Sequence, residues 1–246
     1  MNILILGGTP EARLLCNALA NIPDIHITFS FAGVTPALHP PGATVRTGGF
    51  GGADGLRAFL EAQAIHAVID ATHPFAARMS GNAVAAARLA SCPLLRMVRP
   101  PWPDPPGRNW HHVPEIAAVP DALGSRPRRV FLSTGRKETA PFLDTPHAYL
   151  LRCIVSPDTL LPPHIRILQA RGPFSPESER ALFRDERIDC LVTKNAGGMA
   201  VSAKLEAARD LGIDVIMIDR PPLPPAQECH TIGDALIWIQ DTLRAV

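Results

Sequence analysis

Short apolar segments alternate with amphipathic stretches along nearly the whole chain, and this alternation constrains the fold more than any other feature of the sequence. Two parallel strands need a crossover connection, which is usually a helix, so the alternation is typical of βαβ units. Before residue 100 we expect strands at 2–6, 25–31, 43–47, 67–70 and 93–98, and helices at 11–20, 56–63 and 75–90. This part of the chain is predicted to form one parallel sheet with helices on its faces.

A proline-rich segment, RPPWPDPPGRNW at residues 99–110, interrupts the alternation. Proline fixes φ and cannot donate a backbone hydrogen bond, so this segment is predicted to be a linker. A second set follows, with strands expected at 129–132, 148–154, 166–170, 189–193 and 214–218, and helices at 114–123, 176–186, 202–211 and 232–244. The predicted fold class is therefore α/β, with two Rossmann-like parallel-sheet domains, 1–100 and 101–246, and a cleft between them.

Composition excludes several classes of partner. The formal net charge is +1 and aromatic residues make up 5% of the chain, so no surface suited to nucleic acid or to an anionic membrane is indicated. The five cysteines are scattered without a CxxC pair or metal-ligand spacing, which favours reduced thiols and no metal site. No apolar run reaches about 18 residues, and the chain opens on a strand instead of a signal-peptide pattern. We expect a cytoplasmic protein whose oligomeric state is left open, a monomer included.

The first strand runs directly into the turn GGTPEA, at residues 7–12. Glycine lets a ligand approach the backbone closely, and the N-terminus of the following helix favours an anion. We therefore expect Gly7, Gly8 and Thr9 to contact a cofactor phosphate, which puts the cofactor on the side of the first domain. The turn lacks the spacing of a GxGxxG fingerprint, so an ordinary tight turn is the alternative.

The second and third strands end in FSFAG and RTGGFGG. A domain that selects NAD usually places an acidic residue after its second strand, where it binds the ribose 2′-hydroxyl. The absence of an acid here favours a phosphorylated ribose, with Ser30 as a donor and Arg46 as the cation. Gly48 and Gly49 are expected to lie beside the cofactor, with a flexible surface loop as the alternative.

The fourth strand ends in DATHPFA, ahead of a long alanine-rich helix. Thr72 is a candidate N-cap of that helix and a candidate contact to the cofactor. His73 lies at the same sheet edge, and a histidine in a cleft is a natural proton donor near neutral pH. His73 is therefore the first of two candidate catalytic residues.

Hydroxyl and cationic side chains also follow a strand in the second half, in VFLSTGRKE. Thr134 and Gly135 come at the strand end, where we expect contact with the cofactor. Arg136 and Lys137 open the next turn. Cations at a helix N-terminus oppose the helix dipole, so their presence there favours an anionic ligand over capping. We expect these two cations to bind the substrate.

LVTKNAGG and DRPP repeat the arrangement with Lys194, Asn195 and Arg220. Asn195 and Arg220 are expected to bind the substrate, and Lys194 is the second candidate catalytic residue. Lys204, in SAKLEAA, is expected on a solvated helix face. The second domain is thus predicted to face the anionic groups of the substrate.

Taken together and in this order, GGTPEA, RTGGFGG, DATHPFA, STGRKE, TKNAGG, SAKLEAA and DRPP resemble the precorrin-6A reductase family of cobalamin biosynthesis. The resemblance covers nearly the whole chain. It implies a two-domain Rossmann-like enzyme that uses NADPH to reduce one double bond of precorrin-6A, a small-molecule tetrapyrrole substrate, to precorrin-6B. The carboxylates of that macrocycle suit Arg136, Lys137, Lys194 and Arg220 as partners. Such a reduction needs a hydride and a proton, and we expect the proton from His73, from Lys194 or from water.

Two positions depart from the family pattern. Ala196 stands where the TKxSGG element has serine, and Ala32-Gly33-Val34 stands where AGR is common. The second departure removes an arginine that would meet a 2′-phosphate, so selection of NADPH over NADH depends on Arg46 or another cation.

Three other functions are alternatives to this one. A cobalt-precorrin-6A reductase of the anaerobic branch and a non-catalytic dinucleotide-sensing or tetrapyrrole-binding protein both remain compatible with these residues. A short-chain dehydrogenase is disfavoured, because the single tyrosine, Tyr149, is followed by LLRC instead of completing a Tyr-x-x-x-Lys pair.

Overall fold

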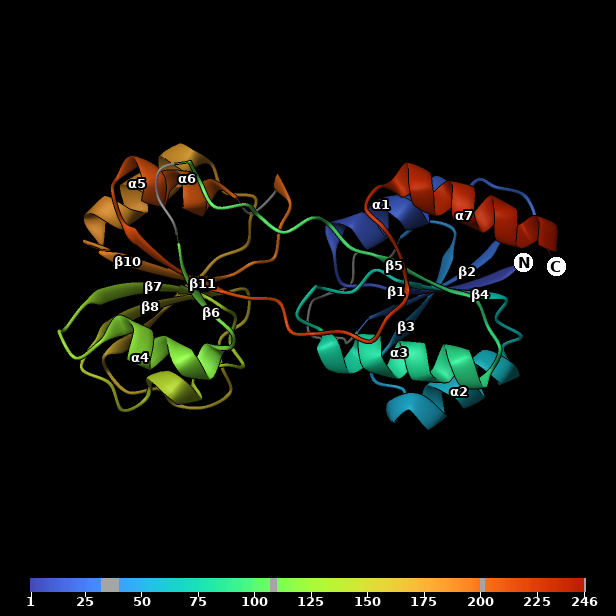
Figure 1. The fold of residues 1–246 in the computed structure, drawn as a ribbon, viewed down its shortest axis with the longest axis horizontal. Coiled ribbons are helices and arrows are strands. Elements are labelled where there is room, and N and C mark those ends of the chain that lie inside the picture. The colour runs from blue at the N-terminus through green and yellow to red at the C-terminus, as the bar shows by residue number, and fades with distance from the viewer. Residues whose placement is uncertain (32–39, 107–109, 200–201, 246) are drawn as a thin grey trace. The chain divides into compact units, whose positions relative to one another are not determined.

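Two compact units make up the computed structural model, which describes residues 1–31, 40–106, 110–199 and 202–245. Unit 1 comprises Met1–Arg99 and Pro222–Val246, and unit 2 comprises Pro100–Pro221. Each unit contains a six-stranded sheet in which all neighbouring strands are parallel. Helices flank both sheets (Figure 1), so the predicted α/β class with two Rossmann-like parallel sheets is confirmed.

The sheet of unit 1 has the strand order β12-β5-β4-β1-β2-β3. The unit contains β1 (Asn2–Leu6), α1 (Pro10–Leu19), β2 (His26–Phe31), β3 (Ala43–Thr47), α2 (Gly52–Ala62), β4 (Ala67–Asp70), α3 (Ala77–Leu89), β5 (Leu94–Met97), β12 (Gln227–Cys229) and α7 (Ile232–Ala245). The chain winds one way from β1 to β3 and the other way from β4 to β12. The winding therefore reverses between β1 and β4, and ligands of such sheets bind outside the carboxyl ends of the strands at that point.

Alternation along β1 explains why unit 1 has a core on both faces of its sheet. Ile3 and Ile5 pack in one buried cluster with residues of α1 and α7, while Leu4 and Leu6 pack in another with residues of α2 and α3. Successive side chains of a strand point to opposite faces, so an uninterrupted apolar run is what a sheet covered on both sides requires. Figure 1 shows these two helix pairs on the two faces.

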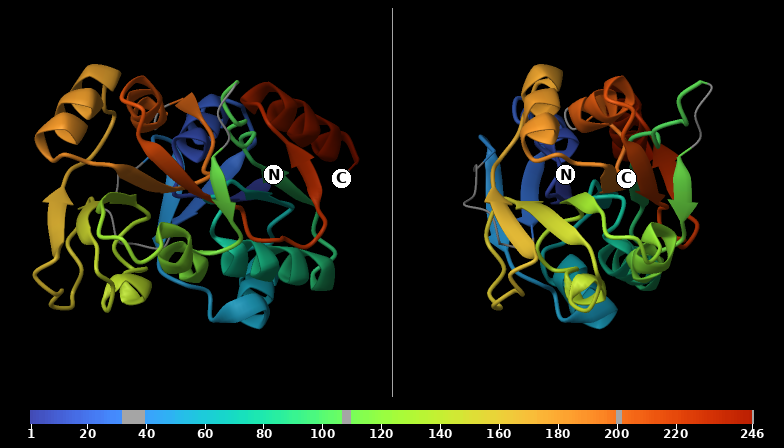
Figure 2. Two further views of the ribbon diagram at one scale, coloured as in Figure 1. Left: turned by 60° about the vertical axis from the view of Figure 1, so that its left-hand side comes forward. Right: turned by 90° about the vertical axis from the view of Figure 1, so that its left-hand side faces the viewer.

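The sheet of unit 2 has the strand order β6-β11-β10-β7-β8-β9. The unit contains β6 (His111–Val113), α4 (Val119–Leu123), β7 (Arg129–Ser133), β8 (Ala148–Cys153), β9 (Ile165–Gln169), α5 (Pro176–Asp185), β10 (Cys190–Lys194), α6 (Ala203–Asp210) and β11 (Asp214–Ile218). Two 3₁₀ turns, Ile116–Ala118 and Ala140–Phe142, complete it. In this sheet the winding reverses between β7 and β10, and Figures 1 and 2 show α5 and α6 on the face opposite α4.

The second expected domain, residues 101–246, does not form one unit. The chain returns to unit 1 at Pro222, where β12 pairs in parallel with β5 and Ala235 and Ile239 of α7 enter the core beneath α1. The sixth strand of unit 1 therefore comes from the end of the chain. The sequence did not predict β12 or β6, because a strand of three residues is too short to produce a recognisable pattern.

Three helices differ from the expected bounds by more than one residue. Helix α3 begins at Ala77 with Ala76 as its N-cap, so Thr72 does not cap it. Helix α2 begins at Gly52, the last residue of the RTGGFGG cluster and ahead of the expected start at Leu56. The helix expected at 114–123 is a 3₁₀ turn followed by the short α4. Among the helices of the described ranges, none combines the length and apolarity needed to cross a membrane.

All five cysteines are free thiols, and four of them are buried. Burial raises the pKa of Cys16 to about 11 and that of Cys190 to about 12. These thiols behave as small apolar core residues, as the sequence predicted.

Candidate functional site

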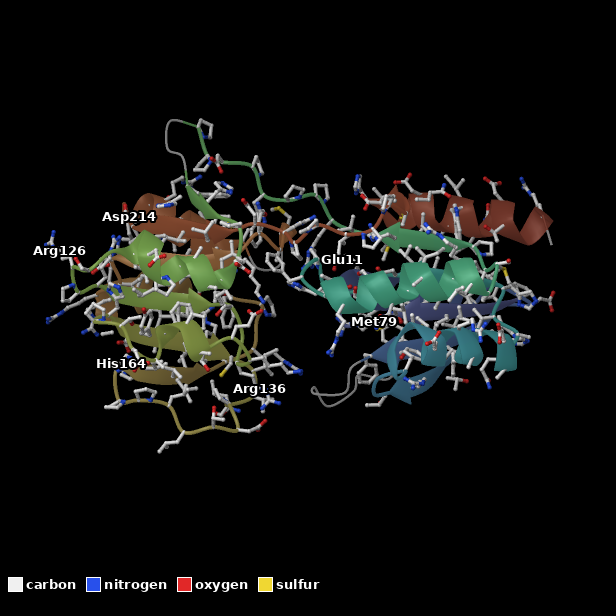
Figure 3. The ribbon with its side chains drawn as sticks, turned by 60° about the horizontal axis from the view of Figure 1, so that its bottom comes forward. Glu11, Met79, Arg126, Arg136, His164 and Asp214 are labelled. Atoms are coloured by element: carbon white, nitrogen blue, oxygen red, sulfur yellow. The ribbon has the colours of Figure 1, made fainter. Side chains whose placement is uncertain are left out.

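All the candidate residues lie at or just beyond the carboxyl ends of the strands of their own sheet. In unit 1 they follow β1, β2, β3 and β4, and in unit 2 they follow β7, β10 and β11. Each unit therefore gathers its candidates at the edge where open parallel sheets bind ligands. In Figure 3, Arg136 and Asp214 mark the carboxyl and amino ends of the unit 2 sheet.

Gly7 and Gly8 have different roles in the first turn. The N–H of Gly7 donates to the carbonyl oxygen of Ser30 at 2.7 Å, and a Cβ on Gly7 would lie 2.3 Å from the Phe29 ring. Gly7 is thus required by packing, and its N–H is already used. Gly8 has a φ of +120° and open space where a Cβ would stand. This turn therefore exposes backbone to a ligand at Gly8 and not at Gly7.

Thr9 is the N-cap of α1. Its hydroxyl accepts from the N–H of Ala12 at 3.1 Å and donates to the carbonyl oxygen of Ala71 at 2.8 Å, which links the turn to the end of β4. Within the described residues, the N–H groups of Gly8 and Thr9 donate no hydrogen bond. Two open backbone donors beside the positive end of a helix suit an anion.

A small recess lies at the point where the winding of unit 1 reverses. It is lined by Thr9, Glu11, Thr72, Pro74 and residues 97–99. Arg99 donates to both carboxylate oxygens of Glu11, at 3.1 and 2.9 Å, so the acid in the first turn of α1 is neutralised. Figure 3 labels Glu11. Sequence reasoning missed Arg99, although a cation directly after an apolar strand was the available signal.

Arg46 fixes the glycine segment that follows β3. Its guanidinium donates to the carbonyl oxygens of Gly48 and Gly49, both at 2.7 Å, and lies 3.8 Å from the centre of the Phe50 ring. One nitrogen also lies 3.5 Å from the hydroxyl of Ser30, which is buried. The cation is therefore held at the ends of β2 and β3, as the 2′-phosphate hypothesis requires. The neighbouring Ala32-Gly33-Val34 lies outside the described residues.

Thr72 does not cap the helix that follows; its hydroxyl bonds to Asp70 and also lies 3.3 Å from that of Ser80 in α3. Asp70 is 1% exposed, and its Oδ1 accepts from the hydroxyl of Thr72 at 2.7 Å. The other carboxylate oxygen lies 3.7 Å from Nε of Arg96, which is also buried and donates to Glu228 and to the carbonyl oxygen of Pro224. Arg96 therefore connects the end of β4 to the segment that returns from unit 2. In the sequence, a charged residue inside the apolar strand β5 could have identified it.

His73 is half-buried after β4. The backbone N–H of Phe75 donates to Nδ1 of His73 at 3.2 Å. Because Nδ1 accepts this bond, the proton of the neutral ring is on Nε2. This bond orients the ring of His73 at the carboxyl edge of the unit 1 sheet.

Lys194 and Thr134 lie where the winding of unit 2 reverses. Lys194 forms an ion pair with Glu138, whose importance sequence reasoning missed. Thr134 is 7% exposed, and its hydroxyl has no hydrogen-bond partner among the described residues. Buried hydroxyls are nearly always bonded, so this group points to a ligand.

Arg136 and Lys137 differ in their surroundings. Arg136 donates to the carbonyl oxygen of Ser156 at 2.9 Å and to Asp158 at 3.0 Å, which ties the loop after β7 to the loop after β8. Lys137 is exposed. Of the two cations, Lys137 is the one that solvent, and hence a ligand, reaches most easily.

Asn195 and Arg220 organise the loop at 195–198, here called the NAGG loop. The side-chain amide of Asn195 accepts from the backbone N–H of Trp102 and donates to its carbonyl oxygen, and the backbone carbonyl oxygen of Asn195 accepts from Nε of Arg220 at 2.9 Å. Arg220 also donates to the carbonyl oxygen of Ala196 at 3.2 Å. Their long-range partners could not be identified from sequence.

Lys204 is not on a solvated helix face, so that expectation is wrong. It is 7% exposed, and its Nζ lies 5.1 Å from the centre of the Trp102 ring. The short apolar stretches around it in SAKLEAA did not distinguish a buried lysine from an exposed one.

Comparison with known proteins identifies the family. Residues 2–240 match the family model described as precorrin-6x reductase CbiJ/CobK. The chain is similar to the precorrin-6A reductase of Rhodococcus erythropolis, at 47% identity over 98% of both chains, and to that of Rhodobacter capsulatus, at 44% identity over 97% of this chain and 96% of that one. A solved structure of CobK precorrin-6A reductase superposes with a TM-score of 0.90 and 44% identity, covering 98% of this chain and 97% of that one. The chain belongs to the precorrin-6x reductase CbiJ/CobK family.

Proposed function

We propose that this protein reduces the precorrin-6A macrocycle to precorrin-6B with NADPH, as a step of cobalamin biosynthesis. The observation that carries the proposal is the position of the candidate residues. The chain belongs to a reductase family. In unit 1, the open N–H groups of Gly8 and Thr9 lie where the winding of the sheet reverses, and in unit 2 cations lie at the same edge of the sheet.

Unit 1 fits the dinucleotide. The N–H groups of Gly8 and Thr9, beside the N-terminus of α1, are suited to its phosphates. Thr9 keeps this turn in place by capping α1 and bonding to the end of β4. When bound, NADPH supplies the hydride.

Arg46 supports selection of the phosphorylated cofactor. Neither Ser30 nor Phe31 at the end of β2 is an acid, and the cation of Arg46 lies beside the hydroxyl of Ser30. A fixed guanidinium forms strong charge-assisted hydrogen bonds with a phosphate. We infer that Ser30 and Arg46 bind the 2′-phosphate, while Gly48 and Gly49 shape the surface beside it.

Unit 2 suits a polycarboxylate. Lys137 is exposed, and Arg136, Lys194 and Arg220 are fixed at the same edge of the sheet. Cations whose positions are already set lose less conformational entropy on binding than mobile ones. The buried hydroxyl of Thr134 adds a donor that no described residue uses.

His73 and Lys194 are the candidate proton donors. Nδ1 of neutral His73 accepts from the N–H of Phe75, so His73 becomes an acid only when Nδ1 takes up a proton in place of that bond, and Lys194 is paired with the carboxylate of Glu138. The imidazolium of His73 or the ammonium of Lys194 can deliver a proton to the carbon next to the one that receives the hydride.

The test is anaerobic incubation of the pure protein with precorrin-6A and NADPH, following the nicotinamide absorbance. We expect oxidation of one NADPH per macrocycle, a slower reaction with NADH, and a product heavier by two hydrogens. Parallel reactions with cobalt-precorrin-6A assign the branch of the pathway. Binding of both ligands without oxidation would contradict the proposal and favour a sensing or carrier protein.

A further inference from the structure

Trp102 occupies an unusual position for a residue of a proline-rich connection. It lies in the segment that leads from β5 of unit 1 into unit 2, where the sequence predicts only a linker. Its indole Nε1 donates to the carbonyl oxygen of Gly198 at 3.0 Å. Trp102 therefore contacts Gly198, the last residue of the NAGG loop. The loop itself begins directly after Lys194.

The backbone of Trp102 is bonded to the near end of the same loop. Its N–H donates to Oδ1 of Asn195 at 2.8 Å, and its carbonyl oxygen accepts from Nδ2 of Asn195 at 3.2 Å. Asn195 is 6% exposed, so these bonds are shielded from water and cost free energy to break. One residue of the connection thus bonds to both ends of the NAGG loop.

Gly197 shows how closely the connection and the loop approach each other. A Cβ at this position would lie 2.1 Å from the carbonyl oxygen of Pro100, and its φ is +68°. Only glycine satisfies both conditions. The NAGG loop is therefore shaped to receive residues 100–102.

The ring of Trp102 also contacts the helix that follows the loop. The Nζ of Lys204 lies 5.1 Å from the ring centre, within the range of a cation–π contact. Trp102 thus contacts both the NAGG loop and helix α6.

We propose that Trp102 is a positioning residue that holds the NAGG loop, and with it Lys194, in the conformation required for reduction. The inference rests on the proposed reductase function. Trp102 acts through the loop and not by touching the reacting atoms, because its indole and backbone groups are bonded to Gly198 and Asn195. The connection between the units is thereby part of the ligand site of unit 2.

The test compares Trp102→Ala with Trp102→Phe. Phenylalanine retains the ring and the backbone bonds but lacks the indole donor, whereas alanine also removes the ring. We expect Trp102→Ala to lower kcat/KM for precorrin-6A about tenfold or more, with the Kd for NADPH unchanged within about twofold, and Trp102→Phe to recover activity to within about threefold of the wild type.

Trp238→Ala is the matched control. Trp238 lies in α7 of unit 1, and its indole nitrogen donates to Gln227 at 2.9 Å, so its removal also deletes a ring and one hydrogen bond. We expect this variant to lose stability while kcat/KM stays within about twofold of the wild type. Equal losses of kcat/KM in Trp102→Ala and Trp238→Ala would overturn the positioning role.

Amide hydrogen exchange gives a readout that does not depend on turnover. Trp102→Ala is expected to accelerate exchange at residues 194–198 and to leave β1 and β4 unchanged, while Trp102→Phe changes neither region strongly. If Trp102→Ala does not fold, the same comparison is made with Trp102→Leu. Unchanged exchange at residues 194–198 in Trp102→Ala would refute the positioning role, whether or not the wild type reduces precorrin-6A. A wild type that does not reduce precorrin-6A would refute only the proposed function.

Discussion

Single residues at the strand ends both lie at the carboxyl edge of a sheet and hold distant segments in place. The sequence revealed the first role and not the second. A cation or amide at a strand end was visible in Arg46, Asn195 and Arg220, and its place at the carboxyl edge of the sheet was predictable. Their partners were not, because those partners are reached only after folding: Arg220 bonds to a carbonyl 25 residues away. The same reason explains why Glu138 and the burial of Lys204 were missed.

The contrast between Gly7 and Gly8 gives a prediction on cofactor binding. Gly8→Val forces a β-branched residue to a φ of +120° and fills the open space at this turn, so we expect the Kd for NADPH to rise about tenfold. Gly124→Val is the matched control, since Gly124 also has a positive φ and open space but lies at the end of α4. Fluorescence titration measures both, and normal binding by Gly8→Val would refute the phosphate hypothesis.

Gly7→Ala should act on stability instead. Its Cβ would lie 2.3 Å from the Phe29 ring, so the ring must move within a packed core, at a cost of about 1–3 kcal/mol in the free energy of unfolding. Urea denaturation measures this loss. Wild-type stability combined with weakened NADPH binding would show that Gly7 acts on the ligand.

The proton donor is tested by single-turnover reduction in His73→Ala and Lys194→Ala. General acid catalysis contributes about 10²- to 10⁴-fold, so we expect a loss of this size in one of the two variants. Unchanged rates in both would assign the proton to water.

At the scale of elements, strands of four or more residues were predictable and the three-residue strands were not. Strands β1, β4 and β11 are mostly apolar runs between turn residues and have the expected bounds, as does the more polar β3 at the edge of its sheet. The edge strands β6 and β12 have three residues each and depend on a neighbour already in place. Helix α3 starts later than predicted because His73 and Phe75 form a turn of their own ahead of it.

Arg96 is expected to hold β12 against the sheet. Arg96→Leu removes the bonds to Glu228 and Pro224 and leaves the buried carboxylate of Asp70 without its cation, at a cost of about 3 kcal/mol in the free energy of unfolding. The double variant Arg96→Leu with Asp70→Asn removes that charge, so it should be more stable than Arg96→Leu alone. Equal stabilities by urea denaturation would exclude a role for the Asp70 charge.

At the scale of the whole molecule, the chain crosses between its units twice, and unit 1 depends on a strand and a helix that follow the second crossing. A fragment of residues 1–100 lacks β12 and α7, so Ile5, Leu15 and Leu95 lose their cover. We expect the circular dichroism spectrum of this fragment to be that of an unfolded chain. Residues 1–99 joined by a flexible linker to 222–246 should fold cooperatively, and a folded 1–100 fragment would contradict this account of unit 1.

His112 forms hydrogen bonds within unit 2 to both segments that connect the two units. It bonds to Asp219, at the end of β11, at 2.6 Å and to Asp104, in the first connection, at 2.8 Å. Hydrogen bonds to these two carboxylates raise the pKa of His112 above its ordinary value of 6.5. Asp104 and Asp219 are the charged groups that face the ring, and both favour its protonated form.

The stability that His112 contributes should therefore depend on pH. A raised pKa in the folded state means that the contribution is fully present below pH 6.5 and is lost as the pH rises through the folded value. We expect His112→Gln to lower Tm more at about pH 6 than at about pH 9. A Tm difference that is the same at both pH values would refute the ionic link.

We propose that this chain brings a nicotinamide reductant and a polycarboxylate macrocycle together for hydride transfer. Anaerobic single turnover of precorrin-6A with NADPH deuterated at the transferred position, followed by mass spectrometry of the macrocycle, tests this directly. We expect a product that carries one deuterium and forms at the rate of NADPH oxidation. A macrocycle that binds but remains unlabelled and unreduced would contradict it.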